Sequence, residues 1–300
     1  TGQPLPLTRK NLARLNTLNG DSKRKEDSAY FESETMPIST TASEFQQQAY
    51  ENGILDPTAS RPPHDLDALR RHLTKRRRSI PPSGLAHQQF CEEISYSYNE
   101  AEASDIMRTE IMVNYRHLDQ RYSRSISRTI TQIPQRDFNR NLSPPQPDLM
   151  EGLKASFLSP GLRTYALHSD RSLALCHFAT EFKRTDGNLA QAVYQAAYDG
   201  AVLVYARNHA LAGARAKALE GTRDHAAAAL VAAIDRAAGE TAVLTCATDG
   251  TIVEVFAHYF ERGKYHQCRV ANESLLAYPN RGRELLRNAQ DYARRKSHEL

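Results

Sequence analysis

The sequence predicts an α/β protein, and three observations support this prediction. Residues 173–183 form an apolar run without glycine or proline, which is typical of a buried strand. Residues 189–205 follow after a turn and form an alanine-rich run, which is typical of a helix. Residues 241–270 contain two strand pairs that turn at Asp249-Gly250 and Arg262-Gly263. Strands and helices therefore alternate along one chain, as in an α/β fold.

Composition divides the chain into two parts. Its 300 residues have 40% hydrophobic content, which suffices for a core. Residues 1–80 are rich in Thr, Ser, Gln, Asn, Pro and charge, so we expect a loosely ordered N-terminal arm with short helices. Residues 81–300 form the folded domain, with further helices expected at 85–112, 209–239 and 281–295. We expect the last helix to pack on the sheet through one side, which carries Leu285, Leu286, Ala289 and Tyr292.

The predicted strand 173–183 ends with a carboxylate and an amine. Side chains of a strand point alternately to its two faces. Glu181 and Lys183 therefore share one face, while Phe178 and Phe182 share the other. A carboxylate at this position can ligate a hard cation such as Mg²⁺, which prefers oxygen ligands.

Phosphodiester cleavage needs groups of this kind. A bound metal can supply the nucleophilic water, the stabilisation of charge on phosphorus and help for the leaving oxygen. Asp148, in the pair Pro147-Asp148, can give the metal a second carboxylate, and Lys183 can orient the attacking water or neutralise charge. The alternative is that Glu181 and Lys183 form an ordinary surface ion pair, and that residues 143–148 are a turn with an acid in it.

The neighbouring sequence favours the functional interpretation. Asp186-Gly187-Asn188 predicts a turn with a helix N-cap, and Gln191 and Gln195 lie four residues apart on one face of the helix that follows. The order of acidic residue, strand with Glu-X-Lys and helix with Gln resembles the PD-(D/E)XK nuclease superfamily. This resemblance implies a restriction-endonuclease-like core, in which a central mixed β-sheet is flanked by helices and carries an irregular N-terminal extension.

Local phrases along nearly the whole chain resemble a group of fungal, functionally uncharacterised proteins of this superfamily. The phrases are Pro6-Leu7-Thr8, Asn11-Leu12, Asn52-Gly53-Ile54-Leu55, Arg78-Ser79, Pro81-Pro82-Ser83, Asn99-Glu100-Ala101, Pro147-Asp148-Leu149, Glu181-Phe182-Lys183, Tyr265-His266, Leu286-Arg287-Asn288 and Asp291-Tyr292-Ala293. Because the group is known mainly by sequence, the resemblance implies a fold and a site rather than a biological role.

The resemblance carries over to a few residues. Asp148 matches the acid of the Pro-Asp motif, Glu181 and Lys183 match the Glu-X-Lys pair, and Gln195, ahead of Gln191, matches the helix Gln. One departure is the long connection between Asp148 and Glu181, which we expect to hold two strands and an extra loop. If that loop displaces Asp148, the metal site is lost.

The superfamily often adds an acid on its first core helix. In this chain the predicted helix 85–112 offers Glu93 and Glu100, which are seven residues apart and so lie on nearly the same face. The phrase Asn99-Glu100-Ala101 favours Glu100. The alternative for either residue is a solvated carboxylate on the helix surface.

Charge indicates nucleic acid as the partner, with DNA ahead of RNA. The net charge is +4, and basic residues cluster at 70–72 and 75–78 and again at 121–128. The cluster at 75–78 could pair with phosphates, act as a nuclear localisation signal or form a solvated helix face. Residues 121–128 could equally be an exposed helix end. No aromatic-rich platform for single strands, helix-turn-helix pattern or zinc finger appears in the sequence, so it indicates no preferred nucleic-acid sequence.

Cysteine usage predicts an intracellular, reduced protein. The four cysteines are far apart, with no C-x-x-C pair and no apolar leader before them, and no apolar run is long enough to span a membrane. We expect His258 and His266 to face each other across the turn at Arg262-Gly263. Their spacing relative to Cys246 and Cys268 fits no standard zinc pattern.

Two functional hypotheses follow. The first is a metal-dependent endonuclease or related phosphodiesterase. In it Asp148, Glu181 and Glu100 hold Mg²⁺, or Mn²⁺ in its place, while Lys183 positions water and Gln195 steadies that water or a phosphate. The second is a catalytically inactive module of the same fold that binds nucleic acid or protein. A cluster of like charges is costly to keep, which favours the first hypothesis.

Overall fold

A computed structural model describes residues 36–78, 81–113, 115, 119–130, 133–158, 160–165, 173–221 and 239–298. Residues 1–35 and 79–80 of the predicted arm at 1–80 lie outside these ranges. The chain divides into two compact units at Met36, and everything below concerns the unit Pro37–Leu300.

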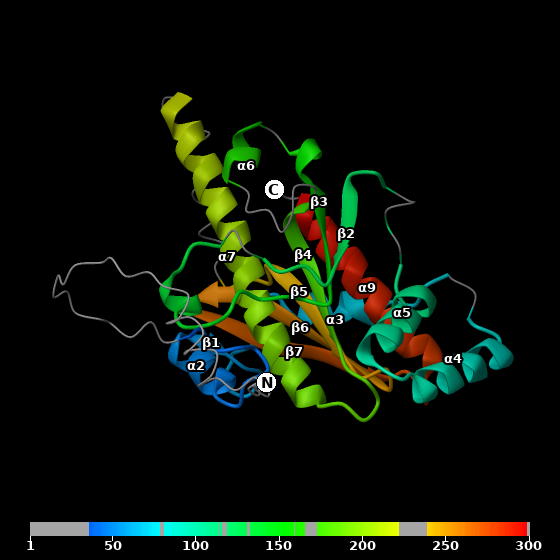
Figure 1. Cartoon of the computed structure of the whole chain (residues 1–300). Coiled ribbons are helices and arrows are strands. Elements are labelled where there is room, and N and C mark those ends of the chain that lie inside the picture. The colour runs from blue at the N-terminus through cyan, green and yellow to red at the C-terminus, as the bar shows by residue number, and fades with distance from the viewer. Residues whose placement is uncertain are drawn as a thin grey trace, which may run out of the picture. The chain divides into compact units, whose positions relative to one another are not determined.

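A seven-stranded mixed sheet forms the centre of this unit, so the predicted α/β class with a mixed sheet is confirmed (Figure 1). The strand order is β1-β7-β6-β5-β4-β3-β2. The pairs β1/β7 and β4/β5 are parallel, and the other neighbours are antiparallel. The strands are β1 (Ile54–Leu55), β2 (Tyr122–Ile126), β3 (Leu149–Lys154), β4 (Leu173–Phe182), β5 (Val243–Thr248), β6 (Ile252–Glu261) and β7 (Lys264–Ser274).

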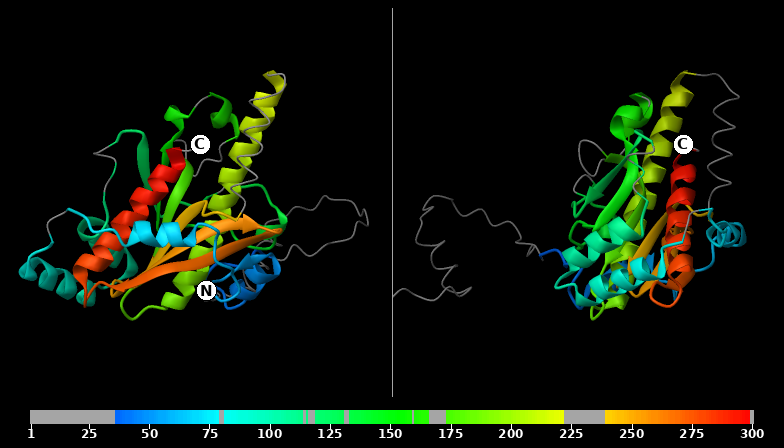
Figure 2. Two further views of the ribbon diagram at one scale, coloured as in Figure 1. Left: turned by 180° about the vertical axis from the view of Figure 1, so that it is seen from behind. Right: turned by 90° about the vertical axis from the view of Figure 1, so that its right-hand side faces the viewer.

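Helices cover both faces of the sheet (Figures 1 and 2). Helix α7 packs on one face together with α2, and α9 packs on the other face together with α3, α4 and α5. The helices are α2 (Phe45–Glu51), α3 (Leu66–Leu73), α4 (Gly84–Tyr96), α5 (Glu100–Glu110), α6 (Pro160–Tyr165), α7 (Leu189–Gly221) and α9 (Pro279–His298), with short 3₁₀ turns η2 (Asp137–Asn139) and η3 (Ala155–Phe157). Among the described residues, none of these helices has the length and apolar content needed to cross a bilayer.

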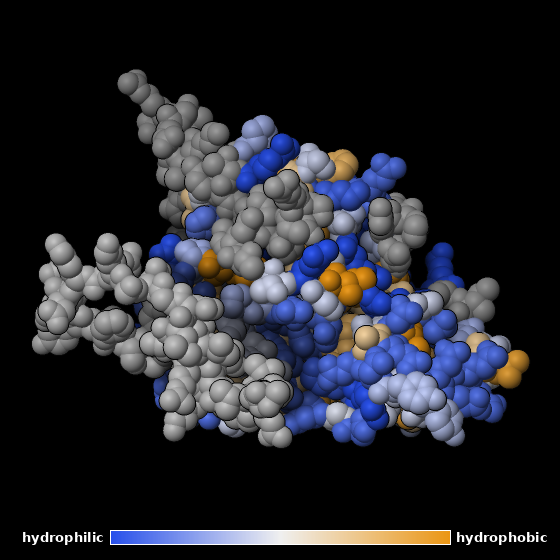
Figure 3. Space-filling view, in the orientation of Figure 1, coloured by the Kyte–Doolittle hydropathy of each residue, from blue (hydrophilic) through white to orange (hydrophobic). Residues whose placement is uncertain are grey.

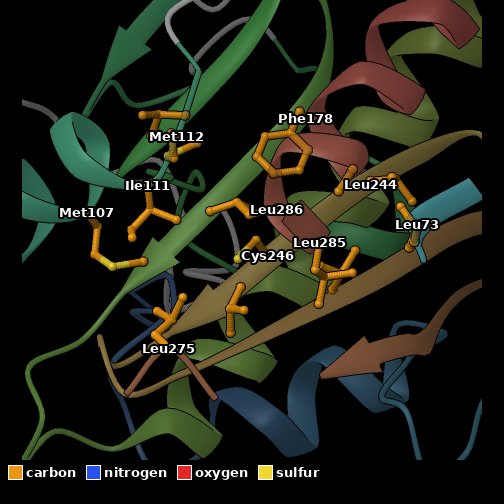
Figure 4. Close-up of a cluster of buried hydrophobic side chains, with 14 of the residues drawn as sticks. Leu73, Met107, Ile111, Met112, Phe178, Leu244, Cys246, Leu275, Leu285 and Leu286 are labelled. Carbon is orange, nitrogen blue, oxygen red and sulfur yellow. The ribbon is translucent and has the colours of Figure 1, made fainter. Parts of the chain in front are cut away.

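The larger core lies between the sheet and α9. Figure 4 shows Phe178 of β4, Leu244 of β5 and Leu286 of α9 converging there, and each is almost completely buried. Helix α9 thus packs on the sheet through its apolar side, as the sequence predicts. The second core, under α7, combines large side chains such as Met150 and Tyr198 with small ones such as Ala197 and Ala201, which let the helix lie close to the strands.

The predicted helix 85–112 is in fact two helices. Helix α4 ends at Tyr96, and α5 begins after Asn99, whose side chain caps it by accepting a hydrogen bond from the Glu102 backbone N–H at 2.9 Å. The Glu102 carboxylate in turn accepts from the Tyr98 backbone N–H at 2.7 Å. This reciprocal capping starts a new helix, so Glu93 and Glu100 do not lie on a common helix face.

The compact unit begins at Pro37, well before the boundary at residue 81 that composition suggests. Ile54 and Leu55 form the edge strand β1 against β7, and both side chains are buried. Leu69 and Leu73 of α3 are completely buried with α9. A few apolar residues therefore fix this otherwise polar segment to the core. The mean composition of residues 1–80 does not show this.

The two predicted hairpins are present as β5-β6 and β6-β7, with positive φ angles at Gly250, Arg262 and Gly263. The expectation that His258 and His266 face each other is wrong. Glu261 pairs with Lys264 across the turn, so His258 pairs with Gln267 and His266 with Tyr259. This offset of one residue sends the two imidazoles to opposite faces of the sheet.

Candidate functional site at the end of β4

The site is built around the last residues of β4. Phe178 and Phe182 pack in the core under α9, whereas Ala179 packs in the core under α7, as strand alternation requires. Glu181 therefore faces α7 and is 4% exposed. Lys183 directly follows the strand, and its backbone N–H continues the pairing by donating to the Thr248 carbonyl at 2.8 Å. The acid and the amine are both buried.

Asp148 is held beside the Glu-X-Lys segment. It immediately precedes β3, which pairs antiparallel with β4 so that Leu149 lies opposite Thr180. Its Oδ2 accepts a hydrogen bond from the Phe182 backbone N–H at 2.7 Å. The long connection after β3 contains η3 and α6 and leads into β4 without displacing Asp148 from the strand end. The loop therefore leaves the acid in place.

Glu100 joins the group from the opposite side. It is the first residue of α5, and its Oε1 lies 3.5 Å from the Nζ of Lys183. The Lys183 ammonium also donates to the Phe182 carbonyl at 3.0 Å. Glu93, the other acid considered on this helical region, is exposed on α4. Of the two acids, Glu100 is the one paired with Lys183.

Sequence reasoning missed Asp199, a buried acid on α7. It is 2% exposed, it shares a hydrogen bond with the Glu181 carboxyl, and its Oδ2 has no hydrogen-bond partner among the described residues. The sequence did contain a signal, because Asp199 interrupts an apolar helical run and lies one turn after Gln195. An acid that faces the core from such a helix needs a partner.

Electrostatics at this site favour shared protons. Burial raises the pKa of Glu181 well above its ordinary value, and the carboxylates of Asp199 and Asp148 raise it further. Burial also raises the pKa values of Asp199 and Asp148, while the positive charge of Lys183 opposes each rise. Two carboxyls in contact cannot both ionise cheaply in a buried site, so the Glu181–Asp199 pair shares a proton.

The two candidate glutamines lie on α7, but the side-chain hydrogen bond of Gln195 is made with the segment before α2. Its Nε2 donates to Thr40 Oγ1 at 3.3 Å, and its Oε1 has no partner among the described residues. Gln191 is half-buried near the start of α7, where its backbone N–H is capped by Asn188 at 3.1 Å. Gln195 is therefore a contact between α7 and the segment before α2, and its predicted role at the site stays a prediction.

The chemistry of the donors suits a hard cation. Asp148, Glu181 and Asp199 offer only oxygen atoms, which Mg²⁺ and Mn²⁺ accept, and Mg²⁺ needs few protein ligands because it keeps several waters. Among the described residues, however, no three His, Cys, Asp or Glu side chains are arranged so that they could hold a metal ion. The buried Oδ2 of Asp199 has no hydrogen-bond partner among the described residues, and a bound cation would give it one interaction.

The basic clusters have structural partners. Arg77 pairs with Asp291 of α9 and donates to Asn288 at 3.0 Å, and Arg76 lies 3.5 Å from Glu284. In the second cluster, Arg124 lies on β2, not on a helix end, and donates to the buried Glu151 at 2.9 Å. Nuclear localisation through residues 75–78 stays a prediction.

No protein-family model, no curated protein and no solved structure matches this chain.

Proposed function

We propose that this protein is a metal-dependent phosphodiesterase that cleaves nucleic acid, built on a PD-(D/E)XK-type core. The observation that supports the proposal is that four acids from separate parts of the chain and one lysine meet at the end of β4. Asp148 is bonded to the Phe182 N–H, Glu100 pairs with Lys183, and Glu181 contacts the acid on α7. Glu181, Lys183 and Asp199 are buried, and a gathering of ionisable groups with perturbed pKa values is characteristic of functional sites.

The order of elements supports the same proposal. A helix with an acid (α5) precedes the antiparallel strands β2, β3 and β4, and α7 then connects β4 to the parallel neighbour β5. The acidic motif lies where β3 begins, and Glu-X-Lys lies where β4 ends. The acid, the strand with Glu-X-Lys and the following helix thus keep the order on which the resemblance to the superfamily rests.

Each side chain has a task in this proposal. A bound divalent cation would supply charge neutralisation and an activated water at the scissile phosphate. Asp148 and Glu181 would hold it through carboxylate oxygens, and Asp199 would keep the Glu181 carboxyl in place through their hydrogen bond. Lys183 would donate to a phosphate oxygen and stabilise the charge that develops on it.

Nicking of plasmid DNA and cleavage of labelled RNA, each with Mg²⁺ and with Mn²⁺, test the proposal. The variants Asp148→Asn and Lys183→Met keep the shape of the side chain while removing its charge. We expect each to lose about 10²–10³-fold in rate, as for loss of one transition-state donor. Glu93→Gln is the matched control, because Glu93 is an exposed acid on α4, and it should cleave like the wild type.

Thermal unfolding of every variant separates loss of chemistry from loss of fold. Equal cleavage by the wild type, Asp148→Asn and Lys183→Met would identify a contaminant and refute the proposal. Cleavage that persists in excess EDTA would refute the metal dependence alone.

The second candidate is an inactive module of the same fold that binds nucleic acid or protein. One observation favours it: two of the charged groups already have partners, since Lys183 pairs with Glu100 and Asp148 accepts from the Phe182 N–H. Titration calorimetry with Mg²⁺ distinguishes the candidates. Heat that is present in the wild type and absent in Asp148→Asn supports the enzyme, whereas no heat in either protein together with retained oligonucleotide binding supports the module.

A further inference from the structure

Two tyrosines project from the link between α4 and α5. Tyr96 is 78% exposed and Tyr98 is 84% exposed. Ser97, between them, is buried, and its Oγ donates to the Ile94 carbonyl at 2.9 Å. The backbone leaves the helical region at Ser97, with φ −59° and ψ 129°, directly after Tyr96, the last residue of α4. The buried Ser97 side chain therefore lies between two exposed rings.

The link is held in place although its rings are exposed. The Tyr98 backbone N–H donates to the Glu102 carboxylate at 2.7 Å, and its carbonyl accepts from Arg184 Nη1 at 2.9 Å. Asn99 then caps α5. A ring on an ordered backbone loses less conformational entropy on binding than a ring on a flexible loop.

The tyrosines lie next to the candidate site. Arg184, which binds the Tyr98 carbonyl, directly follows Lys183, and Glu100, which lies 3.5 Å from Lys183 Nζ, is two residues after Tyr98. Helix α5 lies beside the end of β4 that leads into α7 (Figure 1). The surface over α4 and α5 is otherwise mainly hydrophilic (Figure 3), unlike a broad apolar surface for docking a protein.

We propose that Tyr96 and Tyr98 stack on unpaired bases, so that single-stranded nucleic acid is the substrate class of this site. The proposal rests on the proposed function for its chemistry, but the binding it predicts can be measured without cleavage. Paired bases are already stacked on their neighbours and hidden from side chains, whereas every unpaired base offers a face to an exposed aromatic ring. Such stacking needs the aromatic ring but not the phenol oxygen.

Fluorescence anisotropy of labelled oligonucleotides in EDTA, with the full chain, measures this binding. The probes are a thymine-rich DNA single strand, an RNA single strand of matching sequence and a DNA duplex. We expect Tyr98→Ala to weaken binding of the single strands about 5- to 150-fold, since stacking on one ring has that effect at room temperature. Tyr98→Phe should bind like the wild type, and Tyr96→Ala should weaken binding in the same direction.

The controls make the outcome decisive. Tyr50→Ala removes another exposed tyrosine, 53% exposed on α2 beside the opposite sheet edge, and should change nothing. Duplex affinity should change less than twofold in Tyr98→Ala. Unchanged single-strand binding in Tyr98→Ala, or equal losses for single strand and duplex, would overturn the proposal, as would a wild type that binds none of the probes. Comparing the DNA and RNA strands tells which of them is preferred.

Binding and cleavage can fail separately. A protein that cleaves nucleic acid, and whose Tyr98→Ala variant binds single strands normally, refutes the stacking role and leaves the phosphodiesterase intact. A protein that binds single strands through Tyr98 but never cleaves supports the stacking role and refutes the phosphodiesterase.

Discussion

Replacement of Gly200 by alanine tests the close packing of α7 on the sheet. An added Cβ would lie 2.1 Å from Nδ1 of His258 and 2.3 Å from its Cγ. His258 is 1% exposed on β6, and its Nε2 forms a 2.7 Å hydrogen bond with Thr245 Oγ1 on β5. The ring therefore has no free direction in which to move. Helix and sheet must separate by about 1.3 Å to restore ordinary contact at 3.4 Å.

The expected loss of stability combines three terms. Overpacking of a core costs about 1–3 kcal/mol. Breaking the hydrogen bond between His258 and Thr245 leaves buried polar atoms unpaired and costs about 1–3 kcal/mol. Alanine is favoured over glycine inside a helix by about 1 kcal/mol, which offsets part of the loss. We expect Gly200→Ala to unfold with a free energy lower by roughly 2–4 kcal/mol and a Tm lower by roughly 5–15 °C.

Urea and thermal unfolding followed by far-UV circular dichroism measure this change. Gly84→Ala is the matched control, because Gly84 begins α4 and an added Cβ there meets nothing within 4 Å. We expect that variant to stay within about 1 kcal/mol of the wild type. The double variant Gly200→Ala with His258→Ala should lose less free energy of unfolding than the sum of the two single variants, because removing the ring makes room for the methyl group.

The result that refutes this reasoning is a Gly200→Ala protein as stable as the wild type. Because Gly200 follows Asp199, the same separation would also pull Asp199 away from Glu181. Any cleavage activity should therefore fall in Gly200→Ala even at temperatures where the protein remains folded.

Three further predictions concern buried charge. Burial raises the pKa of Asp199, so the wild type loses stability as pH rises above the ordinary pKa of an aspartate. Relative to the wild type, Asp199→Asn should therefore have a higher Tm at about pH 8 and the same Tm at about pH 4. Burial lowers the pKa of His177 and of His258 from 6.5 to about 3, so stability is fully present above pH 6.5 and is lost as pH falls toward 3. At about pH 5 each histidine should reduce the free energy of unfolding by about 2 kcal/mol, and equal urea midpoints at pH 5 and pH 7.5 would contradict this. Arg124→Met leaves the buried Glu151 without its guanidinium and should cost about 3 kcal/mol in urea unfolding, whereas Arg124→Met with Glu151→Leu should recover most of it.

Strong local patterns predicted the strand with Glu-X-Lys and the apolar side of α9. In both, a long apolar periodicity is matched by burial of Phe178, Phe182 and Leu286. The break between α4 and α5 was also encoded locally, by Asn99 and the acid three residues later. It was missed because the segment contains no proline or central glycine, and apolar residues continue on both sides of the break.

Long-range features could not be predicted in this way. Nothing near Ile54 in the sequence indicates that it pairs with Tyr265, and nothing near Asp199 names Glu181 as its partner. Such contacts depend on the register of distant elements, which local composition does not specify. Asp148, Glu181 and Lys183, at the ends of the neighbouring strands β3 and β4, were predicted from local motifs, and Glu100 on α5 from the resemblance. Asp199 was missed because it reaches the site from α7, across the core.

The hydrogen bonds between α9 and residues 73–75 have a consequence for synthesis on the ribosome. Asn288 of α9 donates to the carbonyls of Leu73 at 2.9 Å and Lys75 at 2.7 Å, across 215 and 213 residues of sequence. At a translation rate of about 5–20 residues per second, roughly 10–40 s pass between the emergence of these partners. During that interval the apolar residues of α3 have no place to bury, so a growing chain exposes them to chaperones. Folding of this unit therefore finishes only after translation reaches its last helix.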